Sequence, residues 1–163
     1  MRYESFDAHP FDPVYDSRSR ILILGSFPSR ASREQQFYYA HKNNRFWKVL
    51  SLIYEEEITD RRQFCLDHRI ALWDVIRSCS IAGSSDASIK DVRVNDFIPL
   101  IRASAIKAIA TTGSTASKLY QKYTDIDIRH IALPSTSSAN AAFHLEDLVK
   151  AYSVIREVTD EED

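Results

Sequence analysis

Four short runs of apolar residues predict four strands that are buried on both faces. The first run covers residues 20–25 (RILILG) and is closed by a glycine. An uninterrupted apolar run of this length is typical of a central strand in a parallel sheet. Three further runs have the same character, at residues 70–75, 105–113 and 128–133.

Apolar residues recur with helical spacing between these runs. The clearest case is residues 44–56, where one helix face would carry Phe46, Val49, Leu50 and Ile53. Asn44 stands where a helix-capping side chain is expected. Four more helices are predicted, at residues 59–69, 95–103, 114–123 and 141–155.

Strands that alternate with helices predict βαβ units with right-handed crossovers. We therefore expect the α/β class, as a three-layer α/β/α sandwich with a central four-stranded parallel sheet. The 163 residues, 44% of them apolar, suit one domain (residues 1–163) whose core needs no disulfide or metal. We expect the folded core at about residues 20–156, followed by a frayed acidic tail at residues 157–163.

The composition argues against several classes of protein. Cys65 and Cys79 are too few for a disulfide framework or an iron–sulfur cluster, and the five histidines lack metal-binding spacing, so no metal is expected. The start of the chain lacks a signal-peptide pattern, and no apolar run approaches the roughly 18 residues of a membrane span. We expect a cytoplasmic monomer that does not bind membranes.

Charge is distributed unevenly, although the net formal charge is only −2. Residues 17–48 contain seven basic side chains and a single acid, Glu34, whereas the tail EVTDEED is strongly acidic. A basic strip can hold phosphates even in a slightly acidic chain. The alternative is an ordinary solvated basic face.

Ligands of open parallel sheets bind at the carboxyl ends of the strands, so the loops after these strands are the candidate sites. The loop that follows Gly25 lacks the second glycine and the lysine of a phosphate-binding P-loop, and it is no nucleophile elbow. The small hydroxyl residues of LPSTSSANA (133–141) suit an anion, or else Ser137 or Ser138 caps the next helix. Asp74 is the only carboxylate at a predicted strand end, and a cap or loop brace is favoured over a base.

Five motifs together resemble the uracil-DNA glycosylase superfamily. They are GSFPS (25–29), YYAHKNNRFW (38–47), ALWDVI (71–76), TGSTA (112–116) and LPSTSSANA (133–141). Within the superfamily they look most like the hypoxanthine-DNA glycosylase (DNA-deoxyinosine glycosylase) branch. The resemblance implies a DNA repair enzyme without a cofactor, which flips a deaminated base and hydrolyses its N-glycosidic bond.

The resemblance also implies roles for individual residues. It assigns the catalytic asparagine to Asn44, which would position water, while Asn43 is a close rival by chemistry. Base-binding roles fall on Gly25, Ser26, Phe27 and Tyr39, the last as a ring that stacks on the flipped base. The partner would be double-stranded or single-stranded DNA containing a damaged base, bound through Pro134, Ser135, Thr136, Ser137, Ser138, Arg30, Arg33 and Lys42.

Two positions depart from the superfamily pattern. Phe27 stands where many members have Asp or Asn, and Leu133 stands where many have His. Neither a phenyl ring nor an aliphatic side chain can position water or stabilise a departing base. Two alternatives therefore stay open: a uracil-preferring or broad-specificity glycosylase, and a catalytically silent DNA-binding module of the same fold.

Overall fold

A four-stranded parallel sheet forms the centre of the molecule in the computed structural model, which describes residues 2–161. The strand order is β3-β2-β6-β7, which confirms the predicted sheet. Each strand corresponds to one of the apolar runs: β2 (Ile21–Gly25), β3 (Ile70–Asp74), β6 (Ala108–Thr112) and β7 (Arg129–Leu133).

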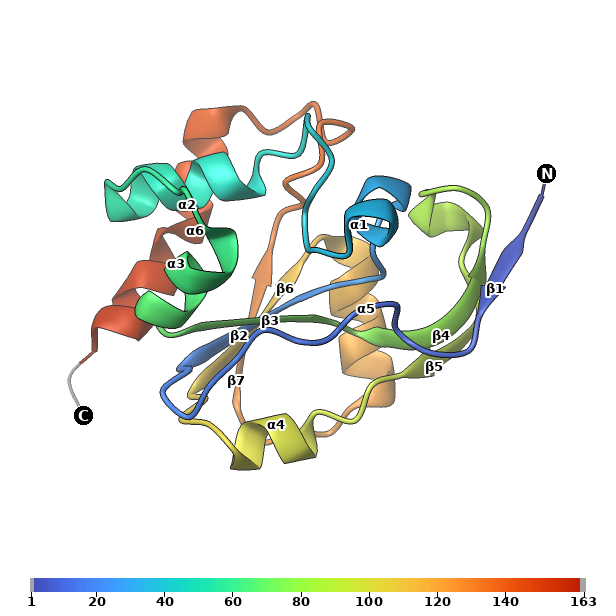
Figure 1. Cartoon of the computed structure of the whole chain (residues 1–163), viewed down its shortest axis with the longest axis horizontal. Coiled ribbons are helices and arrows are strands. Elements are labelled where there is room, and N and C mark those ends of the chain that lie inside the picture. The colour runs from blue at the N-terminus through green and yellow to red at the C-terminus, as the bar shows by residue number, and fades with distance from the viewer. Residues whose placement is uncertain (1, 162–163) are drawn as a thin grey trace.

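Helices cover both faces of this sheet, as the three-layer prediction requires. On β2, Ile21 and Ile23 face one core and Leu22 and Leu24 face another, because successive side chains of a strand point to opposite faces. The first core is closed by α2 (Phe46–Tyr54), α3 (Arg61–Asp67) and α6 (Leu145–Asp160), which lie together in Figure 1. The second core is closed by α4 (Ile98–Arg102) and α5 (Ser114–Tyr123).

A second sheet, which the sequence analysis did not predict, lies on the opposite side of the molecule from α2, α3 and α6 (Figure 1). It is antiparallel, with the order β1-β4-β5, and contains β1 (Glu4–Phe6), β4 (Ile76–Ile81) and β5 (Lys90–Val94). A single residue, Val75, separates β3 from β4, so the apolar run of residues 70–75 leads directly into the new sheet. The turn between β4 and β5 contains a short 3-10 helix, η1 (Asp86–Ser88).

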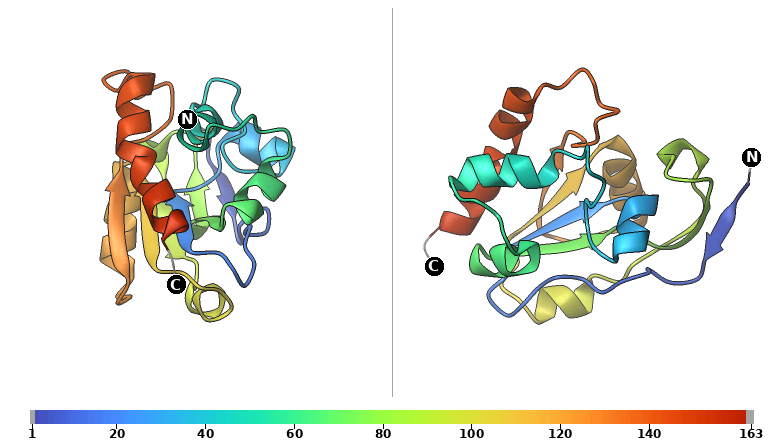
Figure 2. Two further views of the ribbon diagram at one scale, coloured as in Figure 1. Left: turned by 90° about the vertical axis from the view of Figure 1, so that its left-hand side faces the viewer. Right: turned by 45° about the horizontal axis from the view of Figure 1, so that its top comes forward.

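Several predicted helix boundaries are corrected by the structure. The helix expected at residues 141–155 begins at Leu145 and is capped by His144 and Asp147, so neither Ser137 nor Ser138 caps it. Residues 134–144 instead form a long loop, which arches above the segment preceding α2 (Figure 2). The helix expected at residues 95–103 is the shorter α4, and α1 (Arg30–Gln35) was not predicted.

The prediction of a frayed acidic tail at residues 157–163 is also corrected. Residues 157–160 belong to α6 rather than to a frayed end, and Val158 and Thr159 are buried. The Thr159 hydroxyl lies 2.6 Å from the Tyr54 hydroxyl, which fastens the end of α6 to α2. Residues 162–163 of the predicted tail lie outside the described residues.

The described part of the chain contains no helix that is both long and apolar enough to cross a membrane. Within residues 2–161, no group of three or more His, Cys, Asp or Glu side chains is arranged to hold a metal ion.

Candidate active site

A cavity of about 370 Å³ opens at the carboxyl ends of the parallel strands. This volume lies within the range of about 300–1,000 Å³ that is usual for small-molecule sites. Its lining comes from the strand ends, from the segments before and after α1, from the β4–β5 turn and from the loop after β7. The lining residues used below are Gly25, Ser26, Phe27, Tyr39, Asn44, Asp74, Asp86, Thr112 and residues 135–139.

The ends of β2 and β3 form the floor of this cavity. Gly25 pairs with Asp74 in the parallel register, which places the Asp74 carboxylate over the glycine. A Cβ atom at position 25 would lie 2.6 Å from Asp74 Oδ1 and 3.4 Å from the Tyr39 hydroxyl oxygen. Only glycine leaves room for these two polar groups at this point.

Tyr39 is held from two directions. Its ring stacks on Phe46, with centroids 3.8 Å apart and planes inclined by 10°, and its hydroxyl oxygen lies 2.9 Å from Thr112 Oγ1. Its backbone has a positive φ of 51°, which a tyrosine adopts only where the surroundings fix it. Burial raises the pKa of the Tyr39 phenol far above its ordinary value, so the hydroxyl stays neutral.

Asn44 faces the cavity, whereas Asn43 is exposed and does not line it. The Asn44 Oδ1 atom accepts two hydrogen bonds, from the Phe46 amide at 2.9 Å and from Thr136 Oγ1 at 2.8 Å. The first bond satisfies an amide at the start of α2, and the second joins α2 to the loop after β7. Among the described residues, Asn44 Nδ2 has no hydrogen-bond partner, so its two N–H groups remain for a ligand or water.

Arg45 fixes the loop of residues 134–144 beside Asn44. Its backbone amide donates to the Thr136 carbonyl at 3.1 Å, and its guanidinium donates to the carbonyls of Thr136, Ser137, Asn140 and Phe143. The planar guanidinium suits this task because its five N–H groups are fixed in one fork. This role of Arg45 was not predicted from the sequence.

Residues 26–27 form the part of the cavity wall that lies next to the second sheet. Ser26 Oγ donates to Asp86 Oδ1 at 2.8 Å, and Phe27 packs against Phe6, with ring centroids 5.3 Å apart. Asp86 lies on the exposed turn between β4 and β5, but its carboxyl is partly enclosed at the cavity wall. This burial raises the Asp86 pKa, the Ser26 hydrogen bond opposes the rise, and the nearby Asp74 charge adds to it.

The predicted DNA-binding residues differ in their surroundings. Ser135, Thr136, Ser137 and Ser138 all line the cavity, and the largely buried Thr136 also donates to Asn44. Arg33 donates to the carbonyls of Pro28 and Gly83 and lies over the Phe6 ring, so it is a brace between α1 and the β4–β5 turn. Arg30 and Lys42 are exposed, and Pro134 is partly buried.

Two titratable residues at the site were missed by the sequence analysis, His9 and Asp86. The His9 side chain is only 4% exposed and contacts Asp74. No periodic pattern marks residues 7–16, because this segment forms no long strand or helix. Asp86 follows Gly83, Ser84 and Ser85, a turn-like composition that gives no indication of a cavity.

A cavity at the carboxyl ends of the strands is where open parallel sheets bind their ligands. The chain belongs to the uracil DNA glycosylase superfamily, whose family model matches residues 13–156. This confirms the superfamily that the five sequence motifs indicated.

Two relatives and one solved structure extend this comparison. Hypoxanthine DNA glycosylase from Methanosarcina acetivorans is 34% identical over 139 residues, which cover 82% of this chain and 88% of that protein. Hypoxanthine DNA glycosylase from Methanosarcina barkeri is 37% identical over 92 residues, covering 53% of this chain and 58% of that protein. A solution NMR structure from M. acetivorans, of a protein provisionally named a uracil DNA glycosylase, is also similar. Its TM-score against this chain is 0.78 and its sequence identity is 31%. The match covers 91% of this chain and 96% of that chain.

Proposed function

We propose that this protein is a DNA glycosylase that hydrolyses the N-glycosidic bond of a deaminated base, hypoxanthine in deoxyinosine, and leaves an abasic site. The observation that carries the proposal is the single cavity into which Gly25, Tyr39, Asn44 and residues 135–139 converge. The names of the relatives from M. acetivorans and M. barkeri support hypoxanthine as the base.

Asn44 is the residue that we assign to the attacking water. Glycosidic cleavage passes through a cationic sugar while the base leaves as an anion, so the reaction needs a positioned water more than a strong nucleophile. Because Oδ1 is occupied by the Phe46 amide and the Thr136 hydroxyl, the amide plane is fixed. The Nδ2 group then donates to the water oxygen and leaves a lone pair free for attack on the sugar carbon.

The flipped base would stack on Tyr39. Phe46 covers one face of the Tyr39 ring, so the other face is the surface for the base. Stacking on an aromatic side chain contributes roughly 1–3 kcal/mol per base, which offsets part of the cost of flipping. Gly25 permits close approach of the base edge to the floor, and Phe27 supplies an apolar wall.

The loop of residues 134–144 would bind the DNA strand beside the flipped nucleotide. Ser135, Ser137 and Ser138 supply hydroxyl and backbone groups to phosphates, while the buried Thr136 supports Asn44. The exposed Arg30 and Lys42 add attraction to phosphates that is independent of sequence and weakens with salt.

The test is base release from DNA duplexes that contain one hypoxanthine, one uracil or only normal bases, under single-turnover conditions. The expected result is release of hypoxanthine by the wild type and its loss in Asn44→Ala, with Asn43→Ala close to wild type. Release of uracil as fast as that of hypoxanthine, or faster, would favour the uracil-preferring or broad-specificity alternative. No release, together with salt-sensitive DNA binding, would overturn the proposal and favour a silent binding module.

A further inference from the structure

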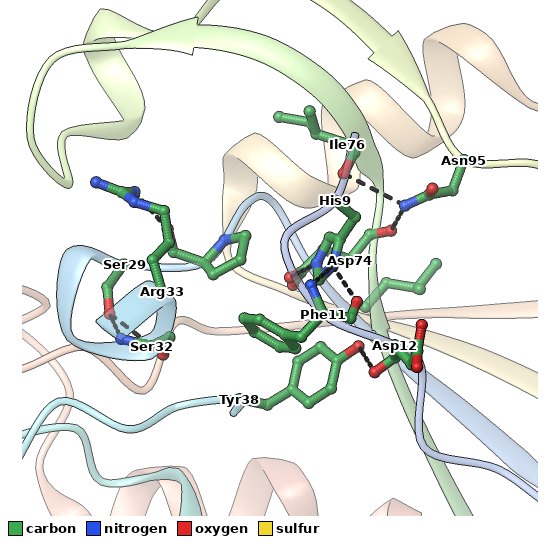
Figure 3. A network of polar contacts seen from close by, with 12 residues as sticks. His9, Phe11, Asp12, Ser29, Ser32, Arg33, Tyr38, Asp74, Ile76 and Asn95 are labelled. Atoms are coloured by element: carbon green, nitrogen blue, oxygen red, sulfur yellow. Dashed lines mark hydrogen bonds and ion pairs between the residues drawn. The ribbon is translucent and has the colours of Figure 1, made fainter. Parts of the chain in front are cut away.

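Two histidines line or border the cavity, and their contacts differ. His9 is buried, and both of its ring nitrogens are occupied (Figure 3). Its Nε2 atom lies 2.8 Å from Asp74 Oδ2, and its Nδ1 atom lies 2.6 Å from the Phe11 carbonyl oxygen. His41, by contrast, is exposed and lines the cavity. A ligand in the cavity can therefore reach His41, whereas His9 has no ring nitrogen to offer.

His41 begins a tight turn that ends at Asn44. The His41 carbonyl accepts a hydrogen bond from the Asn44 amide at 2.9 Å, and His41 Nδ1 accepts one from the Asn43 amide at 3.1 Å. Because Nδ1 uses its lone pair for this bond, the neutral imidazole carries its proton on Nε2. Nε2 points away from the turn, and no atom of residues 2–161 is hydrogen-bonded to it. The turn thus presents one N–H donor to a ligand.

The depth of the cavity decides which part of a nucleotide meets this donor. The floor is made of the buried Gly25 and Asp74, whereas His41 is exposed, as are Ser138 and Ala139 of the lining. A flipped base that reaches the floor leaves its sugar and its flanking phosphates at the mouth. His41 is therefore placed to meet the backbone of the flipped nucleotide and not the edge of its base.

The charge around His41 favours a phosphate. Residues 35–48 contain three basic side chains and no acid. Asp74 and Asp86, acids that line the cavity, are each hydrogen-bonded to another side chain. A phosphate oxygen is a charged acceptor, and hydrogen bonds to charged groups are about twice as strong as neutral ones. An unpaired N–H donor in basic surroundings fits such an oxygen.

We propose that His41 donates from Nε2 to a phosphate oxygen next to the flipped nucleotide, and that the turn of residues 41–44 in this way sets Asn44 relative to the DNA backbone. The inference deepens the proposed function and rests on it. Phosphate contacts fix the register of a protein on DNA without reading its sequence. His41 and Asn44 are the two ends of one hydrogen-bonded turn. A phosphate bound by the first therefore holds the sugar carbon near the water that the second positions.

The experiment measures affinity for a DNA duplex that contains one tetrahydrofuran abasic site, so neither a base nor a reaction enters the result. Each of the two phosphates that flank this site is replaced in turn by a neutral methylphosphonate. Wild-type affinity should fall by about tenfold for one of the two replacements, because a hydrogen bond to a charged oxygen is lost. The other replacement serves as the internal comparison.

Two variants separate the roles of the two ring nitrogens. In His41→Asn the side-chain oxygen still accepts from the Asn43 amide, since asparagine commonly bonds two residues ahead, but the side chain is too short to reach the phosphate. It should bind the unmodified duplex about tenfold more weakly than wild type and lose nothing further with the methylphosphonate.

In His41→Gln the amide nitrogen lies near the place of Nε2, and water replaces the lost acceptor at the exposed Asn43. This variant should keep most of the wild-type affinity and its sensitivity to the methylphosphonate. His68→Asn, the same change at a histidine that does not line the cavity, is the matched control. Melting temperatures of all variants show whether each one folds.

The outcomes distinguish this inference from the proposed function. A wild type that is indifferent to both methylphosphonates overturns the phosphate contact. So does a His41→Asn protein that binds like the wild type or shows the full methylphosphonate loss, and so does a His41→Gln protein as weak as His41→Asn. A methylphosphonate loss that disappears only in His41→Asn, together with no release of hypoxanthine by the wild type, upholds the contact and overturns only the proposed activity.

Discussion

One side of the cavity, formed by Asn44 and residues 135–139, presents amide and hydroxyl groups, and we call it the amide wall. On the other side, the carboxylate floor, Gly25 and Asp74 present a buried acid that His9 holds. The wall depends on side-chain hydrogen bonds between segments more than 90 residues apart, whereas the floor depends on the register of adjacent strands. A wall made in this way is easier to loosen, and its neutral groups suit water and the sugar. The floor is fixed by the sheet, and its charge suits the N–H edge of a base.

The largest expected effect comes from changing the chemistry of the amide wall without moving it. Asn44→Asp keeps an oxygen to accept the bonds from the Phe46 amide and Thr136, but it removes the Nδ2 donor. We expect base release to slow by about 10²–10³-fold, the usual cost of losing one preorganised donor. Single-turnover release of hypoxanthine measures this.

Asn44→Ala is the companion to that variant, because it removes the Nδ2 donor together with the Oδ1 acceptor of the Phe46 amide and Thr136. It should slow base release as much as Asn44→Asp and also lower the free energy of unfolding by about 1 kcal/mol. Urea unfolding distinguishes the two variants. An Asn44→Asp protein as fast as the wild type would mean that an acceptor oxygen positions the water, and would contradict the assignment of Nδ2.

A single methyl group added at Gly25 should disturb the carboxylate floor. In Gly25→Ala the new Cβ would meet Asp74 Oδ1 at 2.6 Å, so the carboxylate or the strand end must shift. We expect hypoxanthine release to fall by about tenfold to a hundredfold, since displacement by about 1 Å is enough to spoil a catalytic arrangement. The same change in an Asp74→Ala background removes the collision and should cost much less. Full additivity of the two changes would argue against a clash at the floor.

The contrast between wall and floor also explains what the sequence could predict. The floor lies at the ends of β2 and β3, whose uninterrupted apolar runs identify them as central strands, and Asp74 was recognised as a strand-end acid. The placement of Asn44, with Asn43 turned outward, follows from the conformation of the loop before α2, which no periodic pattern reports. His9 was missed because β1 has three residues, too few for an alternation to stand out.

The second sheet was missed for a different reason. Its strands β4 and β5 carry exposed Arg77, Lys90 and Arg93 beside buried Ile76 and Cys79, so they lack the uninterrupted apolar character of the parallel strands. The serines and Gly83 of the connecting turn favour a loop in sequence terms. Antiparallel strands with one face toward solvent need an alternating pattern, and two register irregularities between β4 and β5 disturb that pattern.

A smaller effect is expected from loosening the amide wall. Arg45→Lys keeps the positive charge but cannot reach the carbonyls of Thr136, Ser137, Asn140 and Phe143 together. Hydrogen exchange should become faster in residues 134–144, and base release should slow by about tenfold as Asn44 loses its neighbour. Arg102→Lys, on the exposed surface of α4, is the matched control. Unchanged exchange in the loop would mean that other contacts hold the wall.

The smallest effect concerns the second acid beside the floor. Burial raises the pKa of Asp86 above its ordinary value of 3.8, so the native protein binds this proton more tightly than the unfolded chain. Where the native state holds more protons, stability falls as pH rises, so ionisation of Asp86 reduces stability as the pH passes from the unfolded to the folded pKa. Asp86→Asn keeps an acceptor for Ser26 and removes this dependence. We therefore expect the variant to be slightly more stable than the wild type at neutral pH. The difference should shrink as the pH falls through the raised pKa of native Asp86 towards 3.8, the ordinary carboxyl value, and should be absent below it. Urea unfolding across this pH range measures the sign of the stability difference between the variant and the wild type. A variant that is less stable at neutral pH would show that the charge-assisted bond between Ser26 and Asp86 outweighs the cost of burying the carboxylate.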